Sequence, residues 1–221
     1  MDRKFLPISK VSMLGSCEVK FMESMLEKRE PTKFMKIGKE AHERLTIKLP
    51  KMTKEEIINE IKSKKPIQVR ELPVYDEKMR ICGRIDHLAM TGNMENGKNT
   101  GIIIDDKYPS SRSHIYGLTL YYKLQLASYA VALANSESYG NICMAVGAQL
   151  RYREKKNDSI ISSYEMDRKR LEDCEANIDI ASKVAWVLYE NKRKPEHRRL
   201  DVENGEWGKC YCGIYSQALK M

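Results

Sequence analysis

The sequence lacks any long apolar run. None of its apolar stretches approaches the roughly 20 residues that a helix needs to cross a bilayer, and 32% of its 221 residues are charged. The segment Met1–Lys10 has neither a long apolar core nor a small-residue cleavage site, so it does not resemble a secretory signal. We therefore expect a protein that uses no membrane and resides inside the cell, in the cytoplasm.

Several common motifs are missing as well. The sequence has no GxxxxGK[ST] loop and no GxGxxG loop, so neither usual kind of nucleotide binding has support. It also has no low-complexity tract and no internal repeat with a period of roughly 20 to 50 residues. A chain of 221 residues can form one well-packed domain and is too short for two full ones. We expect a single domain over residues 1–221.

Basic residues outnumber acidic ones. Lys and Arg total 39 against 31 Asp and Glu, which gives a net charge of +8. Such an excess favours a polyanion, and nucleic acid in particular, as the partner. The segments 151–156 and 192–199 concentrate the positive charge and could follow a phosphate backbone. A solvated charged surface explains both segments nearly as well.

Apolar spacing predicts helices in the first third of the chain. Two consecutive segments carry apolar residues at helical spacing: Val19, Met22, Met25 and Leu26, then Phe34, Ile37, Ala41 and Leu45. Thr53 to Glu56 forms a capping box, in which two side chains bond reciprocally to N–H groups at a helix start. This motif predicts a short helix that buries Ile57, Ile58 and Ile61.

The pattern changes from helix to strand after Pro66. Ile67–Tyr75 and Arg80–Met90 are separated by a polar tripeptide and predict a hairpin. The pattern downstream predicts a turn over Thr91–Thr100 leading to a buried strand over Gly101–Ile104, a helix over Leu118–Ala134, a pair of strands over Asn141–Arg153, and a long helix over Met166–Tyr189. This order indicates an α/β layered domain.

Asp105, Asp106 and Lys107 come directly after the apolar strand. Because side chains alternate along a strand, Asp105 and Lys107 should project to one face and Asp106 to the other. Asp86 lies on the preceding strand, which the meander order makes a neighbour, so two carboxylates can converge. Hard oxygen ligands suit Mg²⁺ or Mn²⁺, which complete their coordination with water and substrate phosphate. A phosphodiester is the substrate that this arrangement favours.

Three other polar residues have two interpretations each. His42 lies beside Ala41 on the inward side of its predicted helix, where a lone histidine is more often a core residue than a metal ligand. Gln125 and Tyr129 lie four residues apart on one helical face. They can hold a phosphate or orient a catalytic group, or they can simply cap the core.

Four short motifs follow one another along the chain: Gly38–His42, Gly83–Asp86, Ile103–Lys107 and Gln125–Tyr129. In this order they resemble the motifs of the RecB-like nucleases in the PD-(D/E)XK superfamily. The resemblance implies an α/β restriction-endonuclease-like core, a central mixed sheet flanked by helices. It divides the domain into a helical N-terminal part (1–65), a catalytic core (66–153) and a C-terminal helix with a cysteine-bearing tail (160–221), packed against the N-terminal segment.

The same resemblance implies roles for individual residues. Three residues would bind a Mg²⁺ or Mn²⁺ ion: His42, Asp86 and Asp105. The main-chain carbonyl of Asp106 would be a further ligand. Lys107 would activate the attacking water or stabilise the charge that develops on phosphorus. Gln125 and Tyr129 would support Lys107 and the DNA.

Within the superfamily, the chain most resembles the CRISPR-associated RecB-like exonucleases and their viral relatives. These proteins hold an iron–sulfur cluster with one early cysteine and three late ones. Cys17 stands at the early position, and Cys210 and Cys212 stand at the late one. Three thiolates are one short of the four ligands that such a cluster or a structural zinc ordinarily needs.

A fourth ligand could come from His197, from Cys174 or from outside the chain. Cys174, however, falls on the apolar stripe of its predicted helix and is better explained as a core residue. Cys82 and Cys143 fall in predicted strands and have the same explanation. An iron–sulfur cluster thus remains an open expectation of the resemblance.

The function implied is that of a metal-dependent deoxyribonuclease, an exonuclease on single-stranded DNA that leaves 5′-phosphates. It would act in CRISPR adaptation or in viral DNA processing or recombination, with a CRISPR integrase or a recombination protein as partner, or as a homo-oligomer. The incomplete cysteine set favours an alternative, a catalytically idle DNA-binding or complex-forming relative. A third hypothesis is a structural metalloprotein in which the cysteines matter and the acidic residues do not.

Overall fold

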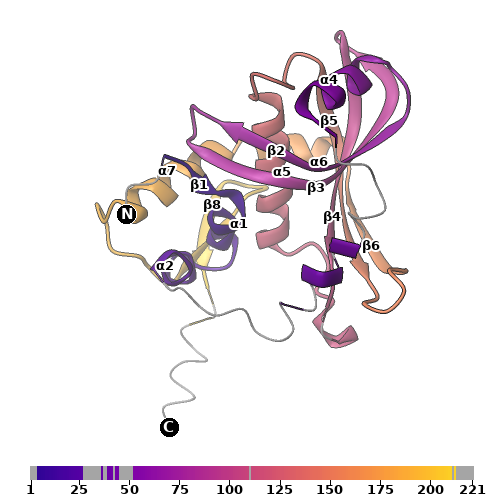
Figure 1. Ribbon diagram of the computed structural model, residues 1–221. Coiled ribbons are helices and arrows are strands. Elements are labelled where there is room, and N and C mark those ends of the chain that lie inside the picture. The colour runs from indigo at the N-terminus through magenta and orange to yellow at the C-terminus, as the bar shows by residue number, and fades with distance from the viewer. Residues whose placement is uncertain are drawn as a thin grey trace.

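The centre of the molecule is a mixed six-stranded sheet (Figure 1). The structure is a computed structural model that describes residues 4–26, 36, 39–41, 43–44, 52–109, 111–210 and 212. The strands of the large sheet are β1 (Leu6–Pro7), β2 (Ile67–Asp76), β3 (Ile81–Glu95), β4 (Lys98–Lys107), β5 (Cys143–Arg153) and β6 (Ile160–Met166). Two further strands, β7 (Arg198–Asp201) and β8 (Glu206–Lys209), form a small hairpin of their own. The restriction-endonuclease-like arrangement of a central mixed sheet with flanking helices is confirmed.

The long strand β3 organises the sheet. β2 runs antiparallel along one edge of β3, from Asp76 opposite Ile81 to Ile67 opposite Met90. β4 pairs antiparallel with the far half of β3, and β1 pairs with its first residues. β4 then pairs parallel with β5, and β6 runs antiparallel to β5. As predicted, the strands that carry Asp86 and Asp105 are direct neighbours.

Helix α5 (Leu120–Ala134) makes the crossover between the parallel strands β4 and β5. Every residue from Leu124 to Leu133 is buried, because α5 contacts β2 to β5 and also α1 (Ile8–Val11), α6 (Arg168–Glu175) and α7 (Ile178–Tyr189). A helix that is buried on all sides and mostly apolar is typical of such a central position. Neither α5 nor any other helix among the described residues is long and apolar enough to cross a membrane.

The N-terminal helices and the C-terminal hairpin lie together. α2 (Glu18–Leu26) contacts α7 and β7, and the short 3₁₀ helix η1 (Ser12–Gly15) also contacts β7. Figure 1 shows this group beside α5, on the opposite side from β6. The fully buried carboxylate of Glu18 accepts bonds of 2.7 Å from both Arg193 and Arg198. The predicted packing of the tail against the N-terminal segment is therefore confirmed.

The capping box at Thr53 is present. The Glu56 amide donates to Thr53 Oγ1 (3.2 Å), and the Thr53 amide donates to Glu56 Oε2 (2.6 Å). Helix α4 (Lys54–Lys62) begins there and buries Ile57 and Ile61. The helix predicted around Phe34 to Leu45 falls mostly outside the described residues; those described there, 36, 39–41 and 43–44, are helical.

Several predicted boundaries were wrong. The long helix expected over Met166–Tyr189 is two helices, α6 and α7, and Met166 belongs to β6. Asn177 separates the helices, because its side-chain amide donates to the carbonyls of Asp173 (3.2 Å) and Val202 (2.9 Å). A polar side chain that bonds to the backbone in this way ends a helix.

The strand predictions needed three corrections. The turn expected over Thr91–Thr100 contracts to Asn96 and Gly97, whose φ values of 49° and 78° suit a tight hairpin, so β3 and β4 extend into the predicted turn. The pair of strands expected over Asn141–Arg153 is a single strand, β5, and its antiparallel partner β6 lies beyond that segment and was not predicted. The β7–β8 hairpin was not predicted either.

Candidate active site

Two carboxylates and one ammonium meet where β3 and β4 run side by side; we call Asp86, Asp105 and Lys107 the carboxylate site. Asp86 Oδ2 accepts a hydrogen bond of 3.1 Å from the main-chain amide of Asp106. The Lys107 ammonium lies 2.9 Å from Oδ1 and 2.7 Å from Oδ2 of Asp105. The structure therefore brings together the three residues that the strand pattern predicted would converge.

The electrostatics of the carboxylate site favour a cation. Burial and the negative charge of Asp105 raise the pKa of Asp86 well above its ordinary value. Burial alone would lower the pKa of Lys107, but the carboxylates of Asp105 and Asp86 outweigh it and raise that pKa. The buried carboxylate of Asp105 and the partly exposed carboxylate of Asp86 thus share one ammonium. A divalent cation would stabilise both in their charged form.

Asp106 faces away from the carboxylate site, as the alternation predicted. Its fully buried carboxylate lies 2.8 Å from Nε2 of His87 and 2.6 Å from Nε of Arg153. Burial alone would raise the pKa of Asp106, but the bonds from His87 and Arg153 lower it. Arg153 also donates to the carbonyl of Asp158 (2.7 Å). This ion-pair network fixes the backbone between Asp105 and Lys107 from behind.

Gln125 and Tyr129 are bonded to each other on α5. The Gln125 amide donates to the Tyr129 hydroxyl (3.3 Å), and both side chains are buried. Tyr129 packs against Gly83 so closely that a Cβ on that glycine would lie 2.6 Å from the Tyr129 ring. Burial, followed by the charge of Asp105, raises the pKa of Tyr129. Both residues therefore border the carboxylate site, although none of the described hydrogen bonds joins either to Lys107.

His42 lies outside the described residues, so its predicted role as a metal ligand stays a prediction. Gln125 offers a different indication of a bound group. Within the described residues, its buried side-chain oxygen Oε1 accepts no hydrogen bond. A buried acceptor of this kind costs free energy unless a water or an ion completes it, so the donor set fits a hydrated divalent cation.

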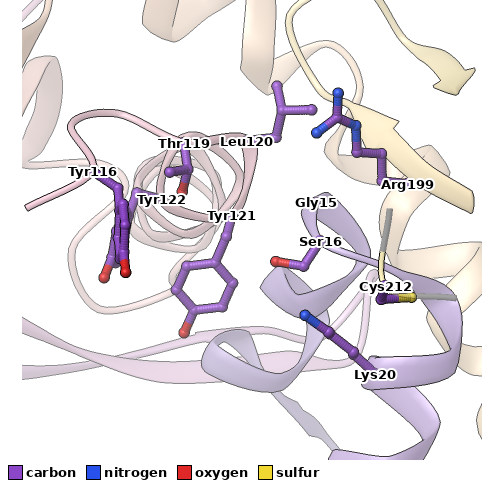
Figure 2. A pocket seen from close by; sticks show the side chains of 10 residues that line it. All are labelled: Gly15, Ser16, Lys20, Tyr116, Thr119, Leu120, Tyr121, Tyr122, Arg199 and Cys212. Carbon is purple, nitrogen blue, oxygen red and sulfur yellow. The ribbon is translucent and has the colours of Figure 1, made fainter. Parts of the chain in front are cut away.

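A surface pocket of about 440 Å³ lies beside the carboxylate site. Three tyrosines line one side of it, Tyr116, Tyr121 and Tyr122, while Lys20 and Arg199 line the other. Figure 2 shows the Tyr121 ring and the Lys20 ammonium facing each other across the opening. The Lys107 ammonium lies 5.7 Å from the centre of the Tyr122 ring, which connects the pocket to the carboxylate site. The pocket thus combines aromatic rings with positive charge.

Three cysteines and one histidine converge at the edge of this pocket; we call Cys17, His197, Cys210 and Cys212 the cysteine cluster. Their donor atoms all lie within 4.8 Å of one another. Cys17 precedes α2, while the other three flank the β7–β8 hairpin. Of the fourth ligands considered, the structure favours His197.

Two of the other three cysteines lie in the core. Cys143 and Cys174 are fully buried, and burial raises the pKa of each thiol to about 12. Cys82 is half-buried on β3. The interpretation of Cys143 and Cys174 as core residues is confirmed.

Several arginines of the basic segments have structural roles. Arg153 binds the buried Asp106, and the Arg193 and Arg198 side chains bind the buried Glu18. These three are therefore engaged inside the fold, which the sequence pattern did not reveal. Arg199 lines the pocket and keeps a surface position.

Sequence patterns also missed part of the site. The support of Asp106 by His87, and the position of Tyr121 and Tyr122 beside Lys107, depend on contacts between separate elements. The one available signal was the adjacency of His87 to Asp86, since neighbours on a strand point to opposite faces and can support a site from behind.

No family model and no curated protein matches the chain by sequence. Solved structures do match it in shape. One is a candidate exonuclease from Eubacterium rectale, with 13% identity and a TM-score of 0.53 over 87% of this chain and 84% of that one. Another is an alkaline exonuclease from Laribacter hongkongensis, with 12% identity and a TM-score of 0.51 over 98% of this chain and 94% of that one. These likenesses show that the chain shares its fold with two proteins described as exonucleases, as the sequence resemblance led us to expect.

Proposed function

We propose that this chain is a divalent-metal-dependent DNA nuclease whose active site is the carboxylate site. The observation that carries the proposal is the convergence of Asp86, Asp105 and Lys107 on two paired strands. Nucleases that share this fold, among them an alkaline exonuclease, support the assignment. Asp86 and Asp105 would hold Mg²⁺ or Mn²⁺, with His42 and the Asp106 carbonyl as further ligands.

The metal ion, when bound, would lower the pKa of a coordinated water and offset the negative charge of the scissile phosphate. Asp105 holds the Lys107 ammonium at the site, where its fixed positive charge stabilises the charge that grows on the phosphate. Asp106 keeps this part of β4 in place through His87 and Arg153. Gln125, whose Oε1 has no partner among the residues that the structure describes, can orient a water on the α5 side.

The pocket supports a single-stranded substrate. Aromatic rings stack on unpaired bases, and cations follow the phosphate backbone. Tyr116 is 64% exposed, and the pocket it lines also contains Lys20 and Arg199. We extend the proposal, on the resemblance, to an exonuclease that leaves 5′-phosphates and acts in CRISPR adaptation or in viral DNA processing or recombination. An integrase or recombination partner belongs to the same extension.

The test is cleavage of end-labelled single-stranded DNA by the full chain with Mg²⁺ or Mn²⁺. Asp105→Ala and Lys107→Ala should each slow cleavage on the order of 10²- to 10³-fold. Asp179→Ala and Lys183→Ala are matched controls, because they break an Asp–Lys pair on the exposed face of α7 and should leave the rate unchanged. Cleavage that persists in both site variants would refute the assignment, as would cleavage that chelators do not stop.

The same experiment decides between cleavage and binding alone. A chain that binds single-stranded DNA but does not cut it with either metal would be the idle DNA-binding relative. Ligation of the products to an acceptor strand then tests the 5′-phosphate, since a 5′-hydroxyl end does not ligate without prior phosphorylation.

A further inference from the structure

The cysteine cluster has the geometry of a single-ion site. The sulfurs of Cys17, Cys210 and Cys212 form a nearly equilateral triangle with sides of 2.9, 3.0 and 3.1 Å. His197 Nδ1 lies 3.2 Å from the Cys212 sulfur and 4.0 Å from each of the other two. The sulfurs are too far apart for a disulfide, whose S–S bond is about 2.0 Å. Four donor atoms therefore surround one small volume.

An iron–sulfur cluster does not fit these separations. In a four-iron cluster each thiolate binds a different iron, so the ligand sulfurs are spread around the outside of the cluster. A single tetrahedral ion with metal–sulfur bonds of about 2.3 Å holds its sulfurs only about 3.8 Å apart. The observed sulfur–sulfur distances are shorter than that by roughly 0.8 Å, so they are much nearer to the spacing around a single ion than to that around a cluster. Insertion of a cluster would require the chain segments on both sides to move apart.

The donor set also points to zinc. Three thiolates and one imidazole form the Cys₃His combination of closed structural zinc sites. Soft sulfur ligands in a tetrahedral arrangement select zinc over magnesium or manganese, which prefer oxygen. The cysteine cluster should therefore bind Zn²⁺ in preference to the Mg²⁺ or Mn²⁺ of the carboxylate site.

An ion-pair network next to the cluster fixes its ligands in place. Glu18, adjacent to Cys17, is fully buried and binds Arg193 through both carboxylate oxygens (2.7 and 2.9 Å). It also accepts bonds from Arg198 Nε (2.7 Å) and from the Glu196 amide (2.9 Å), the two neighbours of His197. The backbone that carries the early ligand and the backbone that carries His197 are thus joined independently of any metal.

We propose that the cysteine cluster binds one Zn²⁺ ion as a closed Cys₃His site, in place of the iron–sulfur cluster that the family resemblance implies. The ion links the start of α2 to the segment that follows β8. Because Cys212 lines the tyrosine pocket, the ion also supports one wall of that pocket. The zinc has a structural role, and it is separate from the metal of the carboxylate site.

Metal analysis of the full chain, expressed with both iron and zinc supplied, tests the proposal. We expect about one zinc per chain, a colourless protein, and no acid-labile sulfide. Replacement by Co²⁺ should give the visible spectrum of a tetrahedral thiolate site. A brown protein with iron and sulfide would overturn the proposal, and so would a chain that holds no metal. None of these measurements uses DNA, so their failure is distinguishable from failure of the proposed nuclease.

Substitutions identify the ligands. Cys17→Ser, Cys210→Ser and His197→Ala should weaken zinc binding by more than the roughly 10- to 100-fold that loss of a group supporting a ligand costs. Cys82→Ser is the matched control, because this half-buried cysteine lies outside the cluster, and it should keep its zinc. His197→Cys supplies a fourth thiolate and should also keep zinc, which covers the case in which a serine variant fails to fold. Equal loss of zinc in Cys82→Ser and Cys210→Ser, or loss in His197→Cys, would contradict the assignment.

Discussion

The carboxylate site and the cysteine cluster are assembled in opposite ways. The carboxylate site lies on two adjacent strands, and the backbone amide of Asp106 bonds directly to Asp86. The cysteine cluster joins residues as far apart as Cys17 and Cys212, which are separated by 195 positions. The carboxylate site is formed by the pairing of β3 with β4. The cysteine cluster, by contrast, helps to determine where the two ends of the described chain lie.

Because of this difference, we expect substitutions at the two sites to have different consequences. A carboxylate removed from a paired strand leaves the ladder of backbone hydrogen bonds intact, so the chemistry should fail while the fold persists. A thiol removed from the cysteine cluster takes away a link between distant segments, so the fold should weaken while the carboxylate site survives. The pocket lies between the two sites, with Tyr122 toward Lys107 and Cys212 at the opposite edge.

The largest effect is expected from Asp86→Asn. The amide oxygen of asparagine can still accept the bond from Asp106, but it provides no charge for a metal ion. Cleavage should fall on the order of 10²- to 10³-fold, while the circular dichroism spectrum stays that of the wild type. If the variant lost its folded structure together with its activity, the carboxylate site would not be separable from the fold in the way we expect.

The same variant should be more stable than the wild type at neutral pH without metal. Burial and Asp105 raise the pKa of Asp86 in the folded chain above its unfolded value of about 3.9. The folded state therefore binds this proton more tightly, and the stability contributed by Asp86 is present below that unfolded value and is lost as pH rises through the folded pKa. Thermal unfolding at pH 4 and pH 8 measures this: the advantage of Asp86→Asn should appear only at pH 8.

The sequence predicted the carboxylate site well because its geometry is local. Alternation along β4 was enough to place Asp105 with Lys107 and to turn Asp106 away, and the meander order made Asp86 a neighbour. The cysteine cluster and the two separate helices α6 and α7 depend on contacts across the fold. Asn177 illustrates this, since its bond to Val202 is invisible in any short window of sequence.

The next largest effect concerns the support behind the carboxylate site. Asp106→Asn removes the negative charge that pairs with both His87 and Arg153, and turns an NH2 donor toward one of these two donors around a fully buried side chain. Breaking such a buried pair should lower the free energy of unfolding by about 3 kcal/mol, measured by urea denaturation. Asp179→Asn, on the exposed face of α7, is the control and should change stability little. A loss for Asp106→Asn as small as that of the control would show that the network does not hold β4 in place.

Removal of zinc should lower the stability of the fold by slightly less than Asp106→Asn does, and it should change the rate of DNA cleavage only a little. If free zinc is about 100 times its dissociation constant, binding stabilises the fold by roughly 2.7 kcal/mol. Cys210→Ser should therefore lower the melting temperature of the zinc-loaded protein toward that of the metal-free wild type. Below that temperature, cleavage at saturating DNA should remain within a few-fold of the wild type. A loss of cleavage as deep as that of Lys107→Ala would mean that the two sites are coupled.

The smallest effect is expected at the pocket between the two sites. Tyr116→Ala removes an exposed ring, and loss of one base-stacking contact costs about 1 kcal/mol, or roughly fivefold in Kd for single-stranded DNA. Binding is measured by fluorescence anisotropy in the Asp105→Ala background, which prevents cleavage. Tyr75→Ala is the matched control, because this tyrosine is 52% exposed on β2 and does not line the pocket. Duplex DNA should bind both variants equally, since paired bases cannot stack on the ring. If Tyr116→Ala weakens the binding of single strands and of duplex equally, the DNA does not stack in this pocket. If it weakens only the binding of single strands, and zinc removal causes part of the same loss, the cysteine cluster helps to shape the path of the strand.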